Sequence, residues 1–372
     1  MASTKAADQQ HKEAEFRDFL IEHSGAINSR NKQLANRRLA AAAGHDFMVL
    51  EELQRGLKEL FRPGWITPHA YKGKRKKVLE RTHNAVWSDL HFGANLDESE
   101  VPMRYGPVEE ARRMGCLITQ IADYKRQYRS NTRLNLLWLG DFIQNMLHDP
   151  REAAAISVQV AATVRYLVRS VLFLAAEYPE IHIYCQSGNH GRDKKRHPER
   201  AVFQKWDSFE MAIYLSVKEA VEATKLPNVH FHLEKRPYQS IDVYGKKLFM
   251  THGDTVLKVR HPSTSINIKE IHQKIMKWNT AHKIGGPFSV FIIGHHHFPV
   301  VAGLPGKASL MVNGCLVPPD SFALSIDSPD VTCGQWVFES VEGHPLGDQR
   351  FIEVDDADDQ PEFDKIVKPF VF

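Results

Sequence analysis

The pattern of apolar and polar positions divides the chain into three parts. Before residue 62 the apolar positions recur at helical spacing, most clearly in the leucines at 50, 53, 57 and 60. From residue 82 short apolar runs alternate with long amphipathic stretches, which predicts an α/β sandwich. From residue 355 acidic residues dominate, as is typical of a solvated tail. We therefore expect a helical N-terminal extension with a basic linker (1–81), a main domain (82–354) and an acidic C-terminal tail (355–372).

The main domain contains runs with the length and composition of strands. Six of them are predicted before residue 299: 85–87, 134–139, 181–186, 230–233, 247–250 and 290–293. The stretches predicted to be helices are 108–127, 151–176 and 201–223. Four further strands separated by Gly and Pro are predicted after residue 299: 300–302, 309–312, 335–339 and 350–353.

Composition indicates an ordinary soluble chain. Of the 372 residues, 42% are hydrophobic and 25% charged, and the net charge of +3 is too small to identify a partner. The four cysteines have no paired spacing, so we expect reduced thiols rather than a disulfide framework or zinc knuckle: Cys116, Cys185, Cys315 and Cys333. The N-terminus lacks the apolar core of a signal peptide, and no apolar run approaches the ~20 residues that span a bilayer. We expect a cytoplasmic protein without a membrane partner.

Residues of metal-binding types follow five of the predicted strands. They form the motifs Asp89-x-His91, Gly140-Asp141, Gly188-Asn189-His190, His252-Gly253 and Gly294-His295-x-His297. Each motif alone is common at turns, but the carboxyl ends of strands in an α/β sheet share the edge where ligands bind. The adjacent glycines allow close backbone approach. The five motifs together therefore predict a metal centre, and mixed imidazole and carboxylate ligands suit Mn, Fe or Zn better than Mg or Ca.

The order of these motifs resembles that of the calcineurin-like metallophosphoesterases. The resemblance covers roughly residues 82–353 and includes Asn313-Gly314, which is similar to that family's Asn-Gly-containing strand. It implies a two-sheet β-sandwich flanked by helices, with two divalent metal ions, manganese first and Fe or Zn as alternatives, at one edge. Two departures stand out. The motif at 140–145 lacks the signature of the Ser/Thr protein phosphatases, which disfavours that activity. Gly191 replaces the acidic residue that often follows the third motif.

The resemblance also implies roles for individual residues. Three would hold one metal and three the other, with Asp141 bridging: Asp89, His91 and His297 for the first, and Asn189, His252 and His295 for the second. A metal-bridging hydroxide would attack phosphorus in line, and His190 would protonate the leaving oxygen. Because Gly191 is not acidic, we hypothesise that Asp254 or Asp193 orients His190. His296, between two ligands, is expected to point away.

Basic residues near these motifs bear on the substrate. The loop after the third motif carries four candidate substrate-binding residues: Arg192, Lys194, Lys195 and Arg196. Positive loops around a phosphate-hydrolysing centre suit a polyanion such as nucleic acid, but they could equally neutralise the phosphate of a small substrate. Residues 11–61 could form a helix-turn-helix DNA reader, or a helical cap whose basic residues are solvated. The basic run at 72–77 could contact phosphate or be a solvated linker.

Three functional hypotheses follow from these observations. The first is a metal-dependent nuclease, similar to the DNA-repair exonuclease branch of the family, with nucleic acid as its substrate. The second is a small-molecule phosphomonoesterase or a nucleotide or cyclic-nucleotide phosphodiesterase. The third is a catalytically silent, DNA-tethered binding module, which the intact ligand set disfavours. Nothing in the sequence indicates the oligomeric state.

Overall fold

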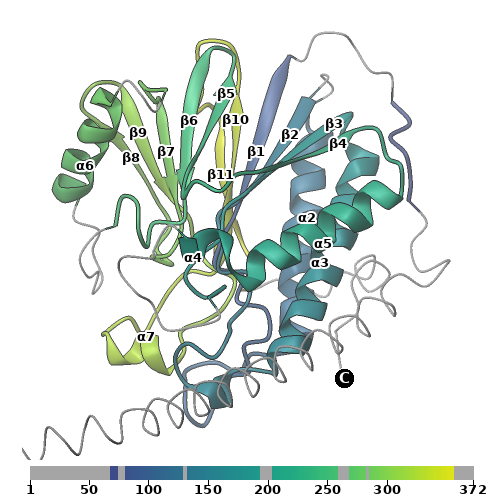
Figure 1. Ribbon diagram of the computed structural model, residues 1–372, viewed down its shortest axis with the longest axis vertical. Coiled ribbons are helices and arrows are strands. Elements are labelled where there is room, and N and C mark those ends of the chain that lie inside the picture. Colours follow the sequence, from purple (N-terminus) through teal and green to yellow (C-terminus); the bar gives the residue numbers. More distant parts are fainter. Residues whose placement is uncertain are drawn as a thin grey trace, which may run out of the picture. The chain divides into compact units, whose positions relative to one another are not determined.

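Two β-sheets lie face to face with helices on their outer sides (Figure 1). The computed structural model describes residues 68–73, 80–128, 132–192, 203–258, 268–281 and 285–355. Both the predicted fold class and the flanking helices are confirmed. The predicted helices and possible helix-turn-helix before residue 62 lie outside the described residues, as does the acidic tail beyond Asp355.

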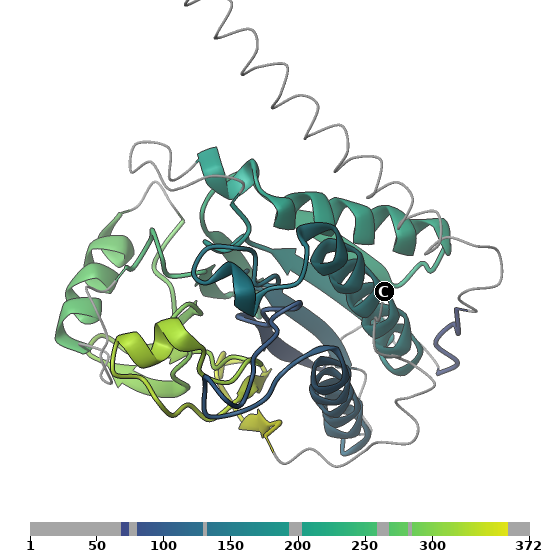
Figure 2. The same cartoon turned by 90° about the horizontal axis from the view of Figure 1, so that it is seen from below.

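The larger sheet has six strands in the order β11-β10-β1-β2-β3-β4. Their bounds are β11 Gln349–Glu353, β10 Gly334–Ser340, β1 Arg81–Trp87, β2 Thr132–Trp138, β3 Glu180–Cys185 and β4 Val229–Leu233. Strands β1 to β4 are parallel, and β10 joins β1 antiparallel. The crossovers between the parallel strands carry α2 (Pro107–Arg126), α3 (Ile156–Glu177) and α5 (Phe209–Ala223), which cover the outer face of this sheet (Figure 2).

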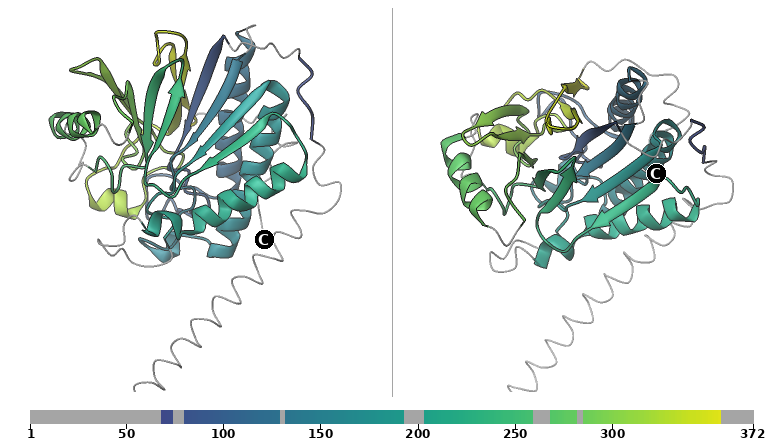
Figure 3. Two further views of the ribbon diagram at one scale, coloured as in Figure 1. Left: turned by 45° about the horizontal axis from the view of Figure 1, so that its top comes forward. Right: turned by 90° about the horizontal axis from the view of Figure 1, so that it is seen from above.

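The smaller sheet has five strands in the order β5-β6-β7-β9-β8. Their bounds are β5 Gln239–Val243, β6 Lys246–Thr251, β7 Val290–Ile293, β9 Ala308–Val312 and β8 Val300–Leu304. Helix α6 (Ile268–Thr280) lies on its outer side (Figure 3). Three short elements complete the described fold: η1 (Pro150–Glu152), α4 (Phe203–Trp206) and α7 (Ser321–Ser325).

Strand β6 illustrates how one strand contributes to two cores. Successive side chains of a strand point to opposite faces. Leu248 and Met250 pack between the sheets with Val86 of β1, whereas Phe249 packs with Ile271 of α6. Apolar residues at every position, rather than alternate ones, are therefore what a strand in this layer requires.

Most predicted elements are present, with shifted ends. The helix predicted at 201–223 is interrupted: α5 starts after Ser208, whose hydroxyl accepts the Met211 amide as an N-cap. Strand β5 and helices α6 and α7 were not predicted. Only two of the five residues of β5 are apolar, Ile241 and Val243, so its hydrophobic signal is weak.

Helix α3 corrects the expectation that no apolar run approaches membrane-spanning length. It has 22 residues and a mean hydropathy of 1.4 over its most apolar window, and 78% of that window is buried inside the fold. Packing in the core accounts for this composition. All four cysteines are buried and free, as predicted. Asp355, assigned to the solvated tail, is instead tied to the domain by an ion pair with Arg113 (3.1 Å).

Candidate metal centre

The five predicted motifs meet where β1, β2, β3, β6 and β7 end. Main-chain hydrogen bonds join their loops: the His91 amide donates to the Asp141 carbonyl (3.0 Å), and the Gly294 amide donates to the His252 carbonyl (2.9 Å). All seven predicted metal ligands lie in this neighbourhood, and most are buried. His296, expected to point away, joins none of the donor groups found among the described residues.

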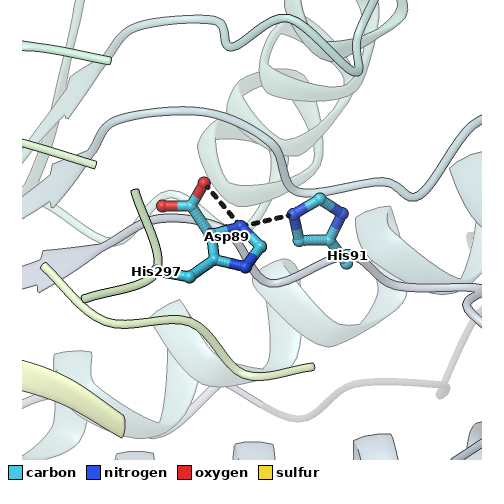
Figure 4. Close-up of side chains that lie close together, drawn as sticks. All are labelled: Asp89, His91 and His297. Atoms are coloured by element: carbon cyan, nitrogen blue, oxygen red, sulfur yellow. Dashed lines mark hydrogen bonds and ion pairs between the residues drawn. The ribbon is translucent and has the colours of Figure 1, made fainter. Parts of the chain in front are cut away.

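The first donor group contains Asp89, His91 and His297, whose ligand atoms all lie within 4.8 Å of one another. Figure 4 shows the three side chains pointing toward one another from two different sheets. Nε2 of His297 is 3.4 Å from Oδ1 of Asp89 and 3.2 Å from Nε2 of His91. Ligands of a tetrahedral ion with bonds of 2.0–2.1 Å are about 3.3 Å apart, so these separations fit a shared cation.

The second donor group contains Asp141, His252 and His295, also within 4.8 Å. Nε2 of His252 is 3.0 Å from Oδ2 of Asp141 and 3.2 Å from Oδ1 of Asn189. Asp141 belongs as well to a third group with His91 and His190. It therefore lies between the two predicted metal positions, where a bridging carboxylate is needed.

Two of the histidines have their other ring nitrogen occupied. Nδ1 of His91 is 2.7 Å from Oε1 of Gln144, and Nδ1 of His252 is 3.0 Å from the Leu139 carbonyl oxygen. The Leu139 carbonyl can only accept, so Nδ1 of His252 carries a hydrogen, and Nε2 is the ring nitrogen that faces Asp141 and would bind a metal ion. Metal-binding histidines are held in this way. The donor set consequently fits divalent metal ions.

The ligand residues have unusual backbone conformations. Five of them have positive φ: Asp89 (54°), His91 (48°), Asp141 (55°), His295 (70°) and His297 (54°). For residues other than glycine this region costs about 1–2 kcal/mol each, and it is enriched at functional sites.

Two glycines allow backbone to reach the ligand carboxylates. A Cβ on Gly188 would lie 1.9 Å from Oδ1 of Asp141, and one on Gly294 would lie 2.7 Å from Oδ2 of Asp89. The neighbouring amides use this space: that of His190 donates to Asp141 (2.7 Å), and that of His295 donates to Asp89 (3.0 Å). This close approach is what the glycines in the motifs indicated.

The centre combines ionised carboxylates with perturbed imidazoles. Burial alone would raise the pKa of Asp141, but the charges of His252 and His190 outweigh it and hold that pKa well below its ordinary value. Burial also opposes the charged form of His252, yet Asp141 raises its pKa to about 9. Burial, together with the neighbouring His190, lowers the pKa of His91 well below its ordinary value. Two buried carboxylates thus require positive charge beside them, which a divalent cation supplies.

Two buried glutamates hold the loops from behind and were not predicted. The Glu210 carboxylate accepts the amides of Phe142 (2.5 Å) and Gly188 (2.6 Å), which follow β2 and β3. Glu110 accepts the Gly93 amide (2.6 Å), which follows β1. Burial raises the pKa of Glu110 to about 8, and burial with the nearby Asp141 raises that of Glu210 to about 7.

His190 has a different partner from the one hypothesised. Its Nδ1 is 2.6 Å from the main-chain carbonyl oxygen of Gln144. Asp254 instead pairs with the buried Lys205 ammonium (2.5 Å). Burial opposes the charged carboxylate, but Lys205 lowers the pKa of Asp254 to about 2. The Asp254 hypothesis is therefore wrong, and Asp193 lies outside the described residues.

Of the predicted substrate-binding residues, only Arg192 is described. Its Nε donates to the Asn189 carbonyl (2.6 Å), so it is anchored next to a predicted ligand. Asn145 fixes this turn because its side-chain amide donates to the carbonyls of both Arg192 (2.6 Å) and His190 (2.5 Å). Lys194, Lys195 and Arg196 lie outside the described residues.

No family model and no curated protein matches the chain. Solved structures that resemble it include an uncharacterised protein from Streptococcus pneumoniae TIGR4 described as a predicted phosphoesterase (12% identity, 74% of this chain and 99% of that one, TM-score 0.29). An archaeal phosphodiesterase also resembles it, at 12% identity over 73% of this chain and 99% of that one, with a TM-score of 0.32. Vacuolar protein sorting 29 from Cryptosporidium parvum does so at 11% identity over 70% of this chain and 86% of that one, with a TM-score of 0.32. A two-sheet sandwich with donor groups at the ends of its strands is what the resemblance of the motifs led us to expect.

Proposed function

We propose that this protein is a metal-dependent phosphoesterase that hydrolyses phosphodiester bonds, with nucleic acid as its substrate. The observation that carries the proposal is the position of Asp141, whose carboxylate belongs both to the group with His252 and His295 and to the group that contains His91 and His190. A carboxylate shared in this way is what a two-metal centre requires. Two divalent ions, when bound, polarise a phosphoryl group and lower the pKa of a water molecule.

The residues divide into those that hold metal and one that moves a proton. Asp89, His91 and His297 would hold one ion, Asn189, His252 and His295 the other, and Asp141 both. Mn is the first expectation and Fe or Zn the alternatives, because the ligands mix nitrogen and oxygen. Since the Gln144 carbonyl can only accept, Nδ1 of His190 carries a hydrogen and Nε2 is the atom that would pass a proton to the leaving oxygen.

Aromatic rings beside the donor groups favour a substrate that carries bases. The His148 ring is 5.2 Å from that of His190, and Phe322 stacks on His148 at 3.9 Å with an angle of 6°. Phe322 is 42% exposed, and Phe298, which follows the predicted ligand His297, is 46% exposed. Exposed rings near a phosphodiester-cleaving centre provide surfaces on which bases stack. Arg192, which donates to the Asn189 carbonyl, adds positive charge next to a predicted ligand.

A substrate panel tests this proposal. Protein loaded with Mn should be assayed on single- and double-stranded DNA, on RNA, and on mono- and bis-p-nitrophenyl phosphate. Cleavage of the polymers supports a nuclease, whereas hydrolysis confined to the small esters supports the phosphomonoesterase or nucleotide phosphodiesterase alternative. No hydrolysis despite two bound metals supports the binding module. Phe322→Ala should weaken polymer cleavage and leave the hydrolysis of bis-p-nitrophenyl phosphate unaffected. Phe351→Ala is not a suitable control, because the Phe351 ring packs on Trp336.

The N-terminal extension gives a separate test of nucleic-acid binding. Its basic residues and the basic linker would contact phosphates, so deleting residues 1–70 should lower nucleic-acid affinity and flatten its salt dependence. Unchanged binding would assign this segment to the alternative role of a helical cap. A cytoplasmic location and the absence of a membrane partner remain part of the proposal.

A further inference from the structure

A second group of metal-binding side chains lies on β3 and β4, away from the predicted dinuclear centre. On β3, Ile181, Ile183 and Cys185 are fully buried, so Glu180 and His182 project to the opposite face of the sheet. On β4, His230 pairs in register with His182, and His232 is two residues further along the same face. One face of the β3–β4 pair therefore presents a carboxylate and three imidazoles.

These side chains are already in contact. Nε2 of His182 is 2.6 Å from Oε1 of Glu180, and Nδ1 of His182 is 2.8 Å from Nε2 of His232. The rings of His182 and His230 are 4.9 Å apart between centroids. One ligand atom each from Glu180, His182 and His230 lies within 4.8 Å of the other two. This group shares no residue with the groups around Asp141.

We propose that Glu180, His182 and His230 bind one divalent transition-metal ion, with Zn²⁺ as the best match. Two imidazoles and a carboxylate are ligands that zinc accepts. Their spacing must close to about 3.3 Å for a tetrahedral ion, which the exposed His230 can achieve by rotation of its side chain. Three protein donors leave a fourth position for water or for a group on a partner.

The contacts around the three ligands fit this assignment. His232 contacts Nδ1 of His182, so Nε2 of His182 would bind the ion beside Glu180. Metal-binding histidines are commonly oriented by such a contact at their other ring nitrogen. Arg133 contacts Oε1 of Glu180 (2.8 Å), and Oε2 is the oxygen that would coordinate the ion. His182 lies three residues before the end of β3, roughly 10 Å from the strand end where the dinuclear ligands gather. The two centres can therefore be occupied independently.

Counting bound zinc tests the proposal without relying on activity. Untagged full-length protein is stripped with a chelator and titrated with Zn²⁺ by calorimetry, and bound metal is measured by mass spectrometry after dialysis. We expect three equivalents for the wild type and two for Glu180→Gln/His230→Ala. His344→Ala, which removes a different exposed histidine, should keep all three. Asp141→Asn should lose zinc from the dinuclear centre and still keep the equivalent that depends on Glu180 and His230.

Two results would overturn the proposal. One is a wild-type protein that binds no more zinc than Glu180→Gln/His230→Ala, which would make the cluster a hydrogen-bonded histidine row. The other is a third zinc equivalent that is lost in Asp141→Asn and retained in Glu180→Gln/His230→Ala. Because His230 is exposed and Glu180 is partly exposed, both substitutions should leave the fold intact, and unfolding curves of the metal-free proteins check this. Failure of the phosphoesterase proposal would leave unchanged the difference of one zinc equivalent between the wild type and Glu180→Gln/His230→Ala.

Discussion

Oδ2 of Asp141 lies 3.0 Å from Nε2 of His252, in the loops that follow β2 and β6. The contact joins the two sheets at the centre of the predicted site. Neither residue is more than 1% exposed. A buried carboxylate and imidazole this close share either a proton or a metal ion, and the second nitrogen of His252 is already held by Leu139. The pair therefore marks the position where metal binding and sheet packing depend on each other.

Replacing Asp141 by Asn should remove the shared carboxylate with little change in shape. We expect loss of at least one metal ion per chain and a fall in phosphoesterase activity of more than about 100-fold. Metal analysis and steady-state kinetics on bis-p-nitrophenyl phosphate measure the two effects. Asp330→Asn, at an exposed position, is the matched control. Normal metal content with normal turnover would remove Asp141 from the bridging position.

His190→Ala separates a proton donor from a metal ligand. We expect both metals to remain bound and kcat to fall by about 100-fold or more, with the larger loss for esters that have poor leaving groups. The comparison needs metal analysis and a series of aryl phosphodiesters with graded leaving-group pKa. Since a ligand atom of His190 also lies within 4.8 Å of those of His91 and Asp141, lost metal would reassign His190 as a ligand.

Gln144→Leu tests the contact that orients His91. The side-chain oxygen of Gln144 is 2.7 Å from Nδ1 of His91. Removing a hydrogen-bond partner of a metal-binding histidine typically lowers metal affinity by about 10–100-fold. We expect a loss of that size, measured by competition with a chelator. The main-chain contact of Gln144 with His190 is retained in the variant. Gln120→Leu, at a half-buried position of α2 where Gln120 accepts a hydrogen bond from Arg350, serves as the control. Equal affinities for the two variants would contradict the role of Gln144.

The sequence could predict that the candidate ligand residues converge, because each follows a predicted strand. A strand of this kind is visible as a run such as Leu134 to Leu139, and the carboxyl ends of parallel strands meet at one edge. Gln144, Glu110 and Glu210 were not identified. They act on main-chain amides or on a histidine contributed by another element, so neither spacing nor periodicity in the sequence distinguishes them from ordinary polar residues.

Strand register was another feature that the sequence could not supply. The alternation in Glu180-Ile-His-Ile-Tyr predicts a strand with one polar face, and β4 carries two histidines at alternate positions. Only the pairing of His182 with His230 brings them together. The positive φ angles of the predicted ligand residues were also hidden, because that conformation is uncommon even for Asp and His, in which it is enriched.

Glu110 should make stability depend on pH. Burial raises its pKa from 4.5 to about 8 in the folded protein, so the folded state binds this proton more tightly than the unfolded state. The resulting stabilisation is fully present below about pH 4.5 and is lost as the pH rises through about 8. Between pH 5 and 8 we expect the free energy of unfolding to fall by on the order of 1–4 kcal/mol because of Glu110.

Glu110→Gln should remove that part of the pH dependence, because Gln cannot ionise and its side-chain oxygen can still accept the Gly93 amide. Urea unfolding of metal-free wild type and variant at pH 5, 6, 7 and 8 gives the difference directly, and contributions from other groups such as Glu210 cancel. Glu98→Gln, at an exposed position on the loop before α2, should follow the wild type at every pH. If the wild type and Glu110→Gln lose stability in parallel from pH 5 to 8, the carboxyl group at 110 has the same pKa in both states, and burial against the loop after β1 does not control its charge.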